Sequence, residues 1–194
     1  IKSGKGVWLY DFDGVKYLDA ISSWWVNLFG HSNAYINKCI KNQLSQLEHV
    51  LLAGFTHEPA INLSERLIKL TPPKITKCFF TDNGSSSIDA AMKMSYHYWQ
   101  NKKKKSKVKF IALSNSYHGE TLGSLSVSNI DLYKKTYKSI LRETIIVDSP
   151  DSYNKAENVS EEKHAEIMFD KMYQTIKKYH LSLIHISEPT RPLY

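Results

Sequence analysis

Short apolar runs alternate with amphipathic segments in the second half of the chain. The runs at 78–81, 108–113 and 144–147 predict strands. Helical spacing of Ile88, Met92, Ser95 and Trp99 within 86–101 predicts a helix between the first two. Strands separated by helices favour right-handed crossovers and a parallel or mostly parallel sheet. The pattern therefore predicts an α/β domain in this half.

The beginning of the chain has a pattern typical of antiparallel strands. Apolar and aromatic residues at 7–10 and 15–19 flank a tight turn in which Asp13 precedes Gly14. Glycine readily adopts the positive φ that hairpin turns require. These residues predict a β-hairpin.

Three amphipathic segments predict further helices. One runs from about 34 to 47 after a capping loop at 30–33, a second runs from 59 to 70 before two prolines, and a third covers 161–180. The apolar stripe of the first consists of Ile36, Ile40 and Leu44.

Two adjacent tryptophans, Trp24 and Trp25, lie between the predicted hairpin and the first helix. Each could fill the core or form the wall of a pocket. Neighbouring side chains of an extended segment point in opposite directions, so such a segment would let one tryptophan take each role.

The net charge of +7 raises the question of nucleic-acid binding. Much of the excess follows the predicted helix that ends near Asn101, and it comes from Lys102, Lys103, Lys104, Lys105, Lys107 and Lys109. Lysines suit the negative end of a helix dipole, and no interleaved aromatic residues or known reader motif accompany them. We interpret the run as a solvated loop and expect no nucleic-acid partner.

The remaining composition argues against several kinds of site. Cys39 and Cys78 lack the C-x-x-C spacing of zinc sites, so we expect neither a metal centre nor a disulfide framework. No apolar run approaches the ~18 residues that cross a bilayer, and no signal peptide is visible, so we expect a cytoplasmic protein without a membrane partner. The chain begins with Ile1 rather than methionine, and we expect it to be part of a longer protein.

The polar turn before the helix at 86–101 is the first candidate binding site. Gly84 would let the backbone approach a ligand closely, and hydroxyl donors would come from Ser85, Ser86 and Ser87. The first N–H groups of a helix have no intrahelical partner and attract anions, so this turn is a candidate phosphate site. An ordinary helix cap explains the same residues, because serine, aspartate and asparagine are preferred there.

A second candidate site follows the predicted strand at 108–113. The carboxyl ends of parallel strands position ligands, and the loop at 114–121 contains Tyr117 and His118. The tyrosine ring could stack on a planar ligand. The alternatives are a surface tyrosine beside a hydrogen-bonded histidine, or a hydrolase site with Ser116, for which the Gly-x-Ser-x-Gly elbow is missing.

Several of these stretches occur together in an order that resembles one enzyme family. They are 13–14, 22–25, 54–60, 81–85 with 90–94, and 117–121. From Gly4 to about Asp148 the chain resembles the class III pyridoxal-phosphate aminotransferases. The paired tryptophans and the Thr-His-x-Pro-Ala stretch at 56–60 resemble the members of that family that act in biotin formation.

The resemblance implies a fold of the aspartate-aminotransferase type, fold type I, with an incomplete large domain and a mostly parallel sheet. Residues 1–45 would be an N-terminal segment of the small domain, and 46–181 would be the first part of the cofactor-binding large domain. The intact protein would be a homodimer with active sites at the subunit interface. The stretch around Thr56 and His57 would contact the partner subunit.

The resemblance also implies the activity and the site. An amino group would pass from S-adenosylmethionine to 7-keto-8-aminopelargonate, with pyridoxal 5'-phosphate as cofactor. Gly84 and Ser85 would hold the cofactor phosphate, Tyr117 would border the pyridine ring and the substrate, and Trp24 would form a wall of the substrate pocket. His118 would be a structural neighbour.

Two features depart from the family pattern. Aminotransferases of this kind need a lysine that bonds covalently to the cofactor, and no lysine here falls in a matching context, so we name no catalytic residue and expect the chain alone to be inactive. Residues 182–194 resemble translated sequencing adapter, so we expect a non-native tail and exclude Glu188 from the site.

The rival interpretations are another class III aminotransferase, acting on an ω-amino acid or ornithine, and a non-catalytic module that binds a phosphate ligand.

Overall fold

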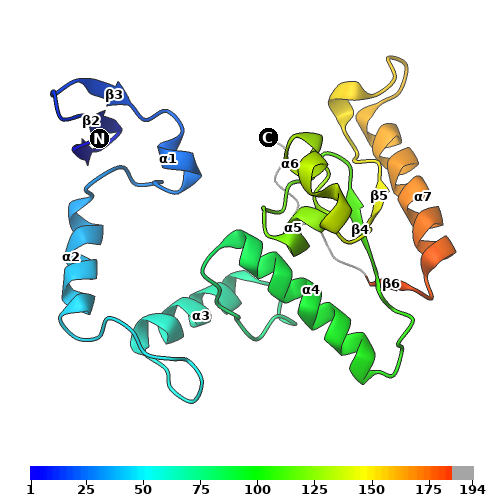
Figure 1. Cartoon of the computed structure of the whole chain (residues 1–194), viewed down its shortest axis with the longest axis horizontal. Helices are drawn as coiled ribbons and strands as arrows, with labels where there is room; N and C mark the ends of the chain where they lie inside the picture. Colours follow the sequence, from blue (N-terminus) through cyan, green and yellow to red (C-terminus); the bar gives the residue numbers. More distant parts are fainter. Residues whose placement is uncertain (185–194) are drawn as a thin grey trace. The chain divides into compact units, whose positions relative to one another are not determined.

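The computed structural model describes residues 1–184, and the chain divides into two units, Ile1–Cys78 and Phe79–Tyr194, each described here by itself (Figure 1). The first unit contains β1 (Ser3–Lys5), β2 (Trp8–Tyr10), β3 (Lys16–Leu18), α1 (Ser22–Trp25), α2 (Ala34–Leu44) and α3 (Glu58–Leu70). The second contains α4 (Gly84–Asn101), β4 (Lys109–Leu113), α5 (Leu122–Val127), α6 (Asp131–Lys134), η1 (Lys135–Ile140), β5 (Ile145–Val147), η2 (Ser152–Asn154), α7 (Glu161–Tyr179) and β6 (Leu183–Ile184).

The predicted hairpin is confirmed and belongs to a three-stranded antiparallel sheet. The order is β1-β2-β3, and Trp8 pairs with Leu18 in the register of β2 and β3. Asp11 holds the turn, because its Oδ1 accepts hydrogen bonds from the N–H groups of Asp13 (3.0 Å) and Val15 (2.8 Å). The pattern did not predict β1, which pairs along β2.

The segment with the two tryptophans is not extended, so that part of the prediction is wrong. All four residues of α1 have positive φ, with values of 48°, 48°, 70° and 65° from Ser22 to Trp25. A left-handed conformation costs about 1–2 kcal/mol for each L-residue, so other contacts must hold it. The two indole rings lie side by side, with centroids 4.8 Å apart, and the side chains of Trp24 and Trp25 are 66% and 72% exposed.

The helices predicted in the first unit are present as α2 and α3. Asn33 caps α2, since its side chain accepts hydrogen bonds from the N–H groups of Tyr35 and Ile36, both at 3.1 Å. Pro59 occupies the first turn of α3, where its missing N–H costs nothing. None of the residues 1–78 is buried, and the predicted apolar stripe of α2 is exposed.

The second unit contains a parallel sheet of order β5-β4-β6. The strands predicted at 108–113 and 144–147 are confirmed as β4 and β5. The strand predicted at 78–81 is wrong: these residues form no strand, and the side chains of Phe79 and Phe80 are exposed. No described strand runs beside them, and a strand needs a hydrogen-bonding neighbour.

Alternate residues of β4 pack against different helices. β4 runs beside β5 in the second unit (Figure 1). Phe110 and Ala112 pack with Met92 of α4 and Val127 of α5, whereas Ile111 packs with a cluster that includes residues of α7. Burial on both faces explains why this strand is a continuous apolar run. The predicted stripe of α4 is confirmed, because Ile88 and Trp99 also pack against the first cluster.

The end of the described chain continues this sheet. Leu183 and Ile184 form β6 beside Lys109 and Phe110, and both side chains are fully buried. The rest of the tail predicted at 182–194 lies outside the described residues.

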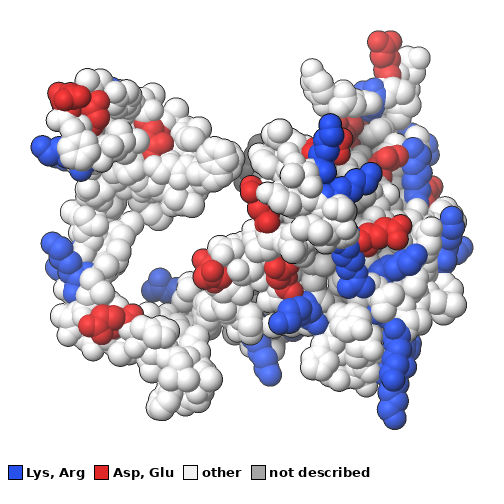
Figure 2. Space-filling view, in the orientation of Figure 1, with Lys and Arg blue, Asp and Glu red and all other residues white. Residues whose placement is uncertain are grey.

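The lysine run follows α4 as predicted. The Nζ atoms of Lys104 and Lys107 lie over the Trp99 ring, 5.5 Å and 4.9 Å from its centroid. On the face in Figure 2, basic side chains of the second unit project singly and are interspersed with acidic ones.

Candidate functional site

The turn before α4 is a true helix cap. Asn83 is the N-cap residue, and its Oδ1 accepts a hydrogen bond from the N–H of Ser86 at 2.9 Å. The Asn83 carbonyl then accepts the N–H of Ser87. The cap explanation is therefore correct for two of the N–H groups in the first turn.

Two other N–H groups of this turn keep their capacity to bind a ligand. Within residues 1–184, no acceptor is hydrogen-bonded to the N–H of Gly84 or Ser85. A Cβ added at Gly84 would meet no atom within 4 Å, so the backbone there faces open space. Free N–H groups at the positive end of a helix of 18 residues attract anions, and here the cap and the candidate phosphate site coexist.

The hydroxyls of the three serines in this turn have different hydrogen-bond partners. The Ser86 hydroxyl is hydrogen-bonded to the Asp82 carboxylate, and the Ser87 hydroxyl donates to the Asn83 carbonyl at 3.1 Å. Only the Ser85 hydroxyl is left to donate to a ligand. Hydrogen bonds, first from Ser86, lower the pKa of Asp82, because they stabilise its charged carboxylate.

The two candidate sites of the sequence meet at Ser85. Its Oγ accepts a hydrogen bond from the N–H of Glu120 at 3.2 Å. Gly119 has a φ of 122°, and a Cβ there would overlap Ser85 Oγ, so only glycine allows this approach. The contact joins the start of α4 to the loop that follows β4, across 35 residues of sequence.

The loop after β4 is fixed by its contacts with the segment around α5. The Ser116 hydroxyl donates to the Leu113 carbonyl at 2.7 Å, and the Ser116 carbonyl accepts from the N–H of Asn129 at 2.8 Å. The N–H of His118 donates to the Ser128 hydroxyl at 2.9 Å. Ser116 is thus used to shape the loop, which argues against a nucleophilic role.

Tyr117 presents a ring that is 44% exposed. Its hydroxyl donates to Glu120 Oε1 at 2.9 Å, and its ring centroid lies 5.4 Å from that of Tyr133. Burial is the largest cause that raises the pKa of Tyr117, and the hydrogen bond to Glu120 raises it further. Tyr133 and Glu120 also line a hollow of about 320 Å³.

Gly84, Ser85 and Tyr117 lie close together in the second unit, since Glu120 is hydrogen-bonded to both Ser85 and Tyr117. Trp24 lies in the exposed turn α1 of the first unit. Glu120 was missed by sequence reasoning, although its position three residues after Tyr117 is a signal for a contact within one turn. Asp19 and His31 beside α1 were also missed, since they lie 12 residues apart and meet only in the fold.

The described residues offer no candidate metal site and no membrane span. No group of three or more His, Cys, Asp or Glu side chains there is placed to hold a metal ion, and no helix there has the length and apolar character to cross a membrane. Cys39 and Cys78 are free thiols.

Comparisons with known proteins gave matches over most of the chain. The sequence model of the family described as Aminotransferase class-III matches residues 1–189. The adenosylmethionine-8-amino-7-oxononanoate aminotransferase of Helicobacter pylori is 52% identical over 160 residues, which are 81% of this chain and 36% of that protein. The chain therefore spans about a third of the length of this relative.

Solved structures match at similar coverage. The adenosylmethionine-8-amino-7-oxononanoate aminotransferase of Methanocaldococcus jannaschii has a TM-score of 0.82 and 34% identity, and the match covers 95% of this chain and 39% of that one. An omega transaminase from Pseudomonas jessenii in complex with PMP has a TM-score of 0.86 and 30% identity, with 97% and 43% covered.

Proposed function

The chain belongs to the class-III aminotransferases and has their fold, fold type I of the pyridoxal-phosphate enzymes, and from this membership we propose that it is the N-terminal part of a longer aminotransferase. The enzyme would transfer an amino group from S-adenosylmethionine to 7-keto-8-aminopelargonate in biotin formation, in the cytoplasm. The names of the H. pylori and M. jannaschii proteins support this choice of reaction.

The observation that carries the proposal is the contact between the start of α4 and the loop after β4. Unpartnered N–H groups, a free hydroxyl and an exposed aromatic ring lie on segments joined at Ser85 and Gly119. An anion and a flat ring in one molecule fit this combination, and pyridoxal 5'-phosphate has both.

The residues present fit this cofactor. The N–H groups of Gly84 and Ser85 and the Ser85 hydroxyl would hold the phosphate, and the Tyr117 ring would lie against the pyridine ring. When bound, the cofactor supplies an electron sink for the bond changes at the substrate's amine carbon. Glu120 accepts the hydrogen bond of the Tyr117 hydroxyl and so orients the phenol that would lie against the ring.

Trp24 is assigned to the substrate. In this proposal its exposed indole forms an apolar wall for the aliphatic chain of the keto acid, and Tyr117 borders the reacting end. The ring is two-thirds exposed in this chain, so it is available for such a contact. Bulky apolar walls favour long aliphatic substrates, because burial of each CH₂ group contributes about 0.8 kcal/mol.

We also propose that the intact enzyme is a homodimer in which the first unit, including the region of Thr56 and His57, contacts the partner subunit. The absence of any buried residue within 1–78 supports this, because an amphipathic helix needs a surface against which to bury its apolar stripe.

A second activity is favoured by one observation. The TM-score to the P. jessenii omega transaminase is slightly higher than that to the M. jannaschii enzyme, although the identity is lower. The alternative is therefore a class-III aminotransferase that takes an ω-amino acid as donor.

Product analysis with the full-length protein separates the two activities. The protein, loaded with pyridoxal phosphate, is incubated with 7-keto-8-aminopelargonate and either S-adenosylmethionine or β-alanine, and the diamine product is measured by mass spectrometry. We expect the diamine with S-adenosylmethionine alone. Amino transfer from β-alanine only would support the second activity, and no transfer from either donor would contradict both.

A further inference from the structure

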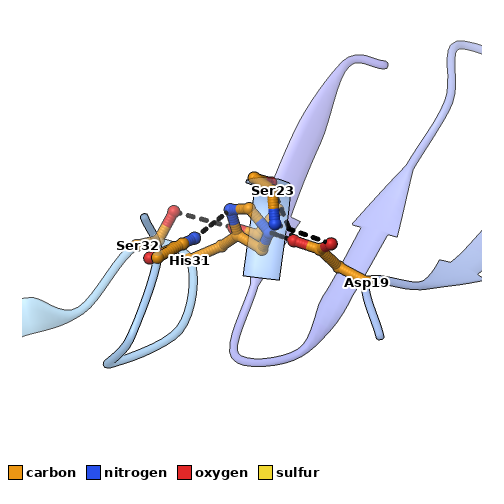
Figure 3. A network of polar contacts seen from close by, with 6 residues as sticks. Asp19, Ser23, His31 and Ser32 are labelled. Atoms are coloured by element: carbon orange, nitrogen blue, oxygen red, sulfur yellow. Dashed lines mark hydrogen bonds and ion pairs between the residues drawn. The ribbon is translucent and has the colours of Figure 1, made fainter. Parts of the chain in front are cut away.

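A carboxylate holds the turn that carries the two tryptophans (Figure 3). Asp19 Oδ1 accepts a hydrogen bond from the N–H of Ser23 at 2.8 Å, and Oδ2 accepts one from the Ser23 hydroxyl at 2.7 Å. Both bonds end on the second residue of α1. They fix the residue next to Trp24 in its left-handed conformation.

His31 completes the network from the other side (Figure 3). Its Nε2 lies 2.7 Å from Asp19 Oδ2, and its Nδ1 lies 2.6 Å from the amide nitrogen of Asn27. An amide nitrogen can only donate, so Nδ1 is the acceptor and the ring proton is on Nε2, which donates to Asp19. The histidine thus orients the carboxylate that binds Ser23.

The backbone around His31 is fixed to the N-terminal sheet. His31 and Gly6 exchange two backbone hydrogen bonds, of 2.8 Å and 3.0 Å. The His31 ring lies against Gly4, where a Cβ would come within 2.7 Å of the ring. Asp19 is fixed as well, since its N–H donates to the Val7 carbonyl at 2.9 Å. The network therefore connects a strand framework to α1.

The network is sheltered while the rings it supports are exposed. The side chains of Asp19 and His31 are 6% and 18% exposed, whereas Trp24 and Trp25, taken as whole residues, are 66% and 72% exposed. Sheltered polar groups of this kind add little stability by themselves, and backbone held in a sparsely populated conformation is typical of functional sites. Because Asp19 binds Ser23, the residue before Trp24, the network restricts where the two indole rings can lie.

We propose that Asp19 and His31 are positioning residues of the substrate pocket, which hold α1 in the left-handed turn that presents Trp24 to the aliphatic part of the keto acid. The inference rests on the proposed function only in assigning Trp24 to the substrate. That the two residues fix the indole pair can be tested without any turnover.

The first test is circular dichroism of the full-length protein. Two indoles with centroids 4.8 Å apart couple their transitions, and the difference spectrum against Trp25→Phe isolates the signal of the pair. We expect Asp19→Ala and His31→Leu to lose this signal. His31→Gln should retain it, because the glutamine amide can still donate to Asp19. Asp11→Ala is the matched control, since Asp11 likewise accepts three hydrogen bonds in the same unit, from two backbone N–H groups and one hydroxyl.

The second test measures whether Asp19 acts through Trp24. In Asp19→Ala we expect the KM for the keto acid to rise about tenfold with little change in kcat, because displacing Trp24 would leave about two CH₂ groups of the keto acid unburied. In a Trp24→Ala background, Asp19→Ala should cause no further rise, since residues that act as a unit are not additive. Affinity for pyridoxal phosphate should not change.

The outcomes are distinguishable. Loss of the indole signal in Asp19→Ala and His31→Leu, its return in His31→Gln, and non-additive KM values support the inference. An unchanged signal in both variants, or an equal KM rise with and without Trp24, overturns it even if the protein is an aminotransferase. If Asp19→Ala does not fold, the two His31 variants decide. Absence of amino transfer in the wild type contradicts the proposed function, while the spectra still decide whether the two residues position the pair.

Discussion

At the scale of single residues, Gly119 decides whether the two parts of the proposed cofactor site can meet. Its φ of 122° and its contact with Ser85 Oγ exclude any side chain. The sequence motifs containing Gly84, Ser85 and Tyr117 could each be recognised separately. The contact between these motifs could not be predicted, because it depends on the course of the loop after β4. The local sequence pattern does not reveal that course.

Gly119→Ala should weaken cofactor binding in the full-length protein. The new Cβ displaces Ser85 and strains the backbone, which costs about 1–3 kcal/mol, so we expect the Kd for pyridoxal phosphate to rise about tenfold or more. The measurement is an absorbance titration. Gly14→Ala is the control, because Gly14 also has positive φ (83°) but has no atom within 4 Å of the added Cβ. Equal Kd values for both variants would contradict the assigned contact.

Tyr117 should ionise at a higher pH than an ordinary tyrosine, with a pKa above 10.0. Because the folded-state pKa is raised, the stabilising contribution of the protonated phenol is complete below pH 10 and is lost as the pH rises through the folded value. Glu120→Gln should lower this pKa only in part, since burial is the larger cause.

An ultraviolet difference titration of this protein against Tyr117→Phe measures that ionisation, with Glu157→Gln as a control in an exposed loop. A pKa for Tyr117 that Glu120→Gln does not move would show that the hydroxyl has no such partner.

At the scale of elements, the long periodic segments were predictable. The stripe of Ile88, Met92 and Trp99 identified α4 because one face of a helix packs on the sheet. The short helix α5 was missed, because six residues are too few to show a helical period and its glycine and serines are poor helix formers. Ser124 and Ser126 are nevertheless buried. Their hydroxyls are satisfied locally: the Ser126 hydroxyl, for example, donates to the Leu122 carbonyl one turn earlier.

The two wrong predictions, a strand at 78–81 and an extended segment at the two tryptophans, have related physical causes. The apolar run at 78–81 has no strand beside it, and apolar character alone does not supply a hydrogen-bonding partner. The left-handed turn at α1 breaks local preferences, so no propensity could predict it. It is held by Asp19 and His31, which lie 12 residues apart in the sequence and meet only in the folded structure.

The two helix caps form a matched pair for an experiment on α4. Asn83→Ala and Asn33→Ala each remove a side chain that accepts N–H bonds from a first turn, so each should lower the free energy of unfolding by about 1 kcal/mol. Only Asn83→Ala should also weaken pyridoxal-phosphate binding, because its helix carries the free N–H groups. Denaturation curves and cofactor titrations of both variants test this. Weakened binding in Asn33→Ala as well would refute the local role of α4.

At the scale of the whole molecule, burial is distributed unevenly. The buried apolar residues lie in the second unit, around β4, while the apolar side chains of α2 and α3 are exposed, for example Ile40 at 52% and Leu70 at 84%. Exposed apolar surface of this extent marks an interface or a liability to aggregate. We take it as a surface that the rest of the enzyme or its partner subunit covers.

The 194-residue chain expressed alone should therefore be prone to aggregation. We expect it to bind a hydrophobic dye and to lack a sharp thermal transition, whereas the full-length protein should melt cooperatively and elute as a dimer. Calorimetry and size-exclusion chromatography make the comparison. A soluble monomer of the short chain with a sharp cooperative melt would contradict this account.

The most direct test of the central claim is a visible absorbance spectrum of the full-length protein with pyridoxal phosphate. We predict a protein-dependent band that bleaches on addition of S-adenosylmethionine and returns with 7-keto-8-aminopelargonate, since bound pyridoxal phosphate would supply the chemistry for amino transfer between this donor and this acceptor. Phosphate-dependent binding without such a band would leave an anion site at the start of α4 and contradict the assignment of an aminotransferase.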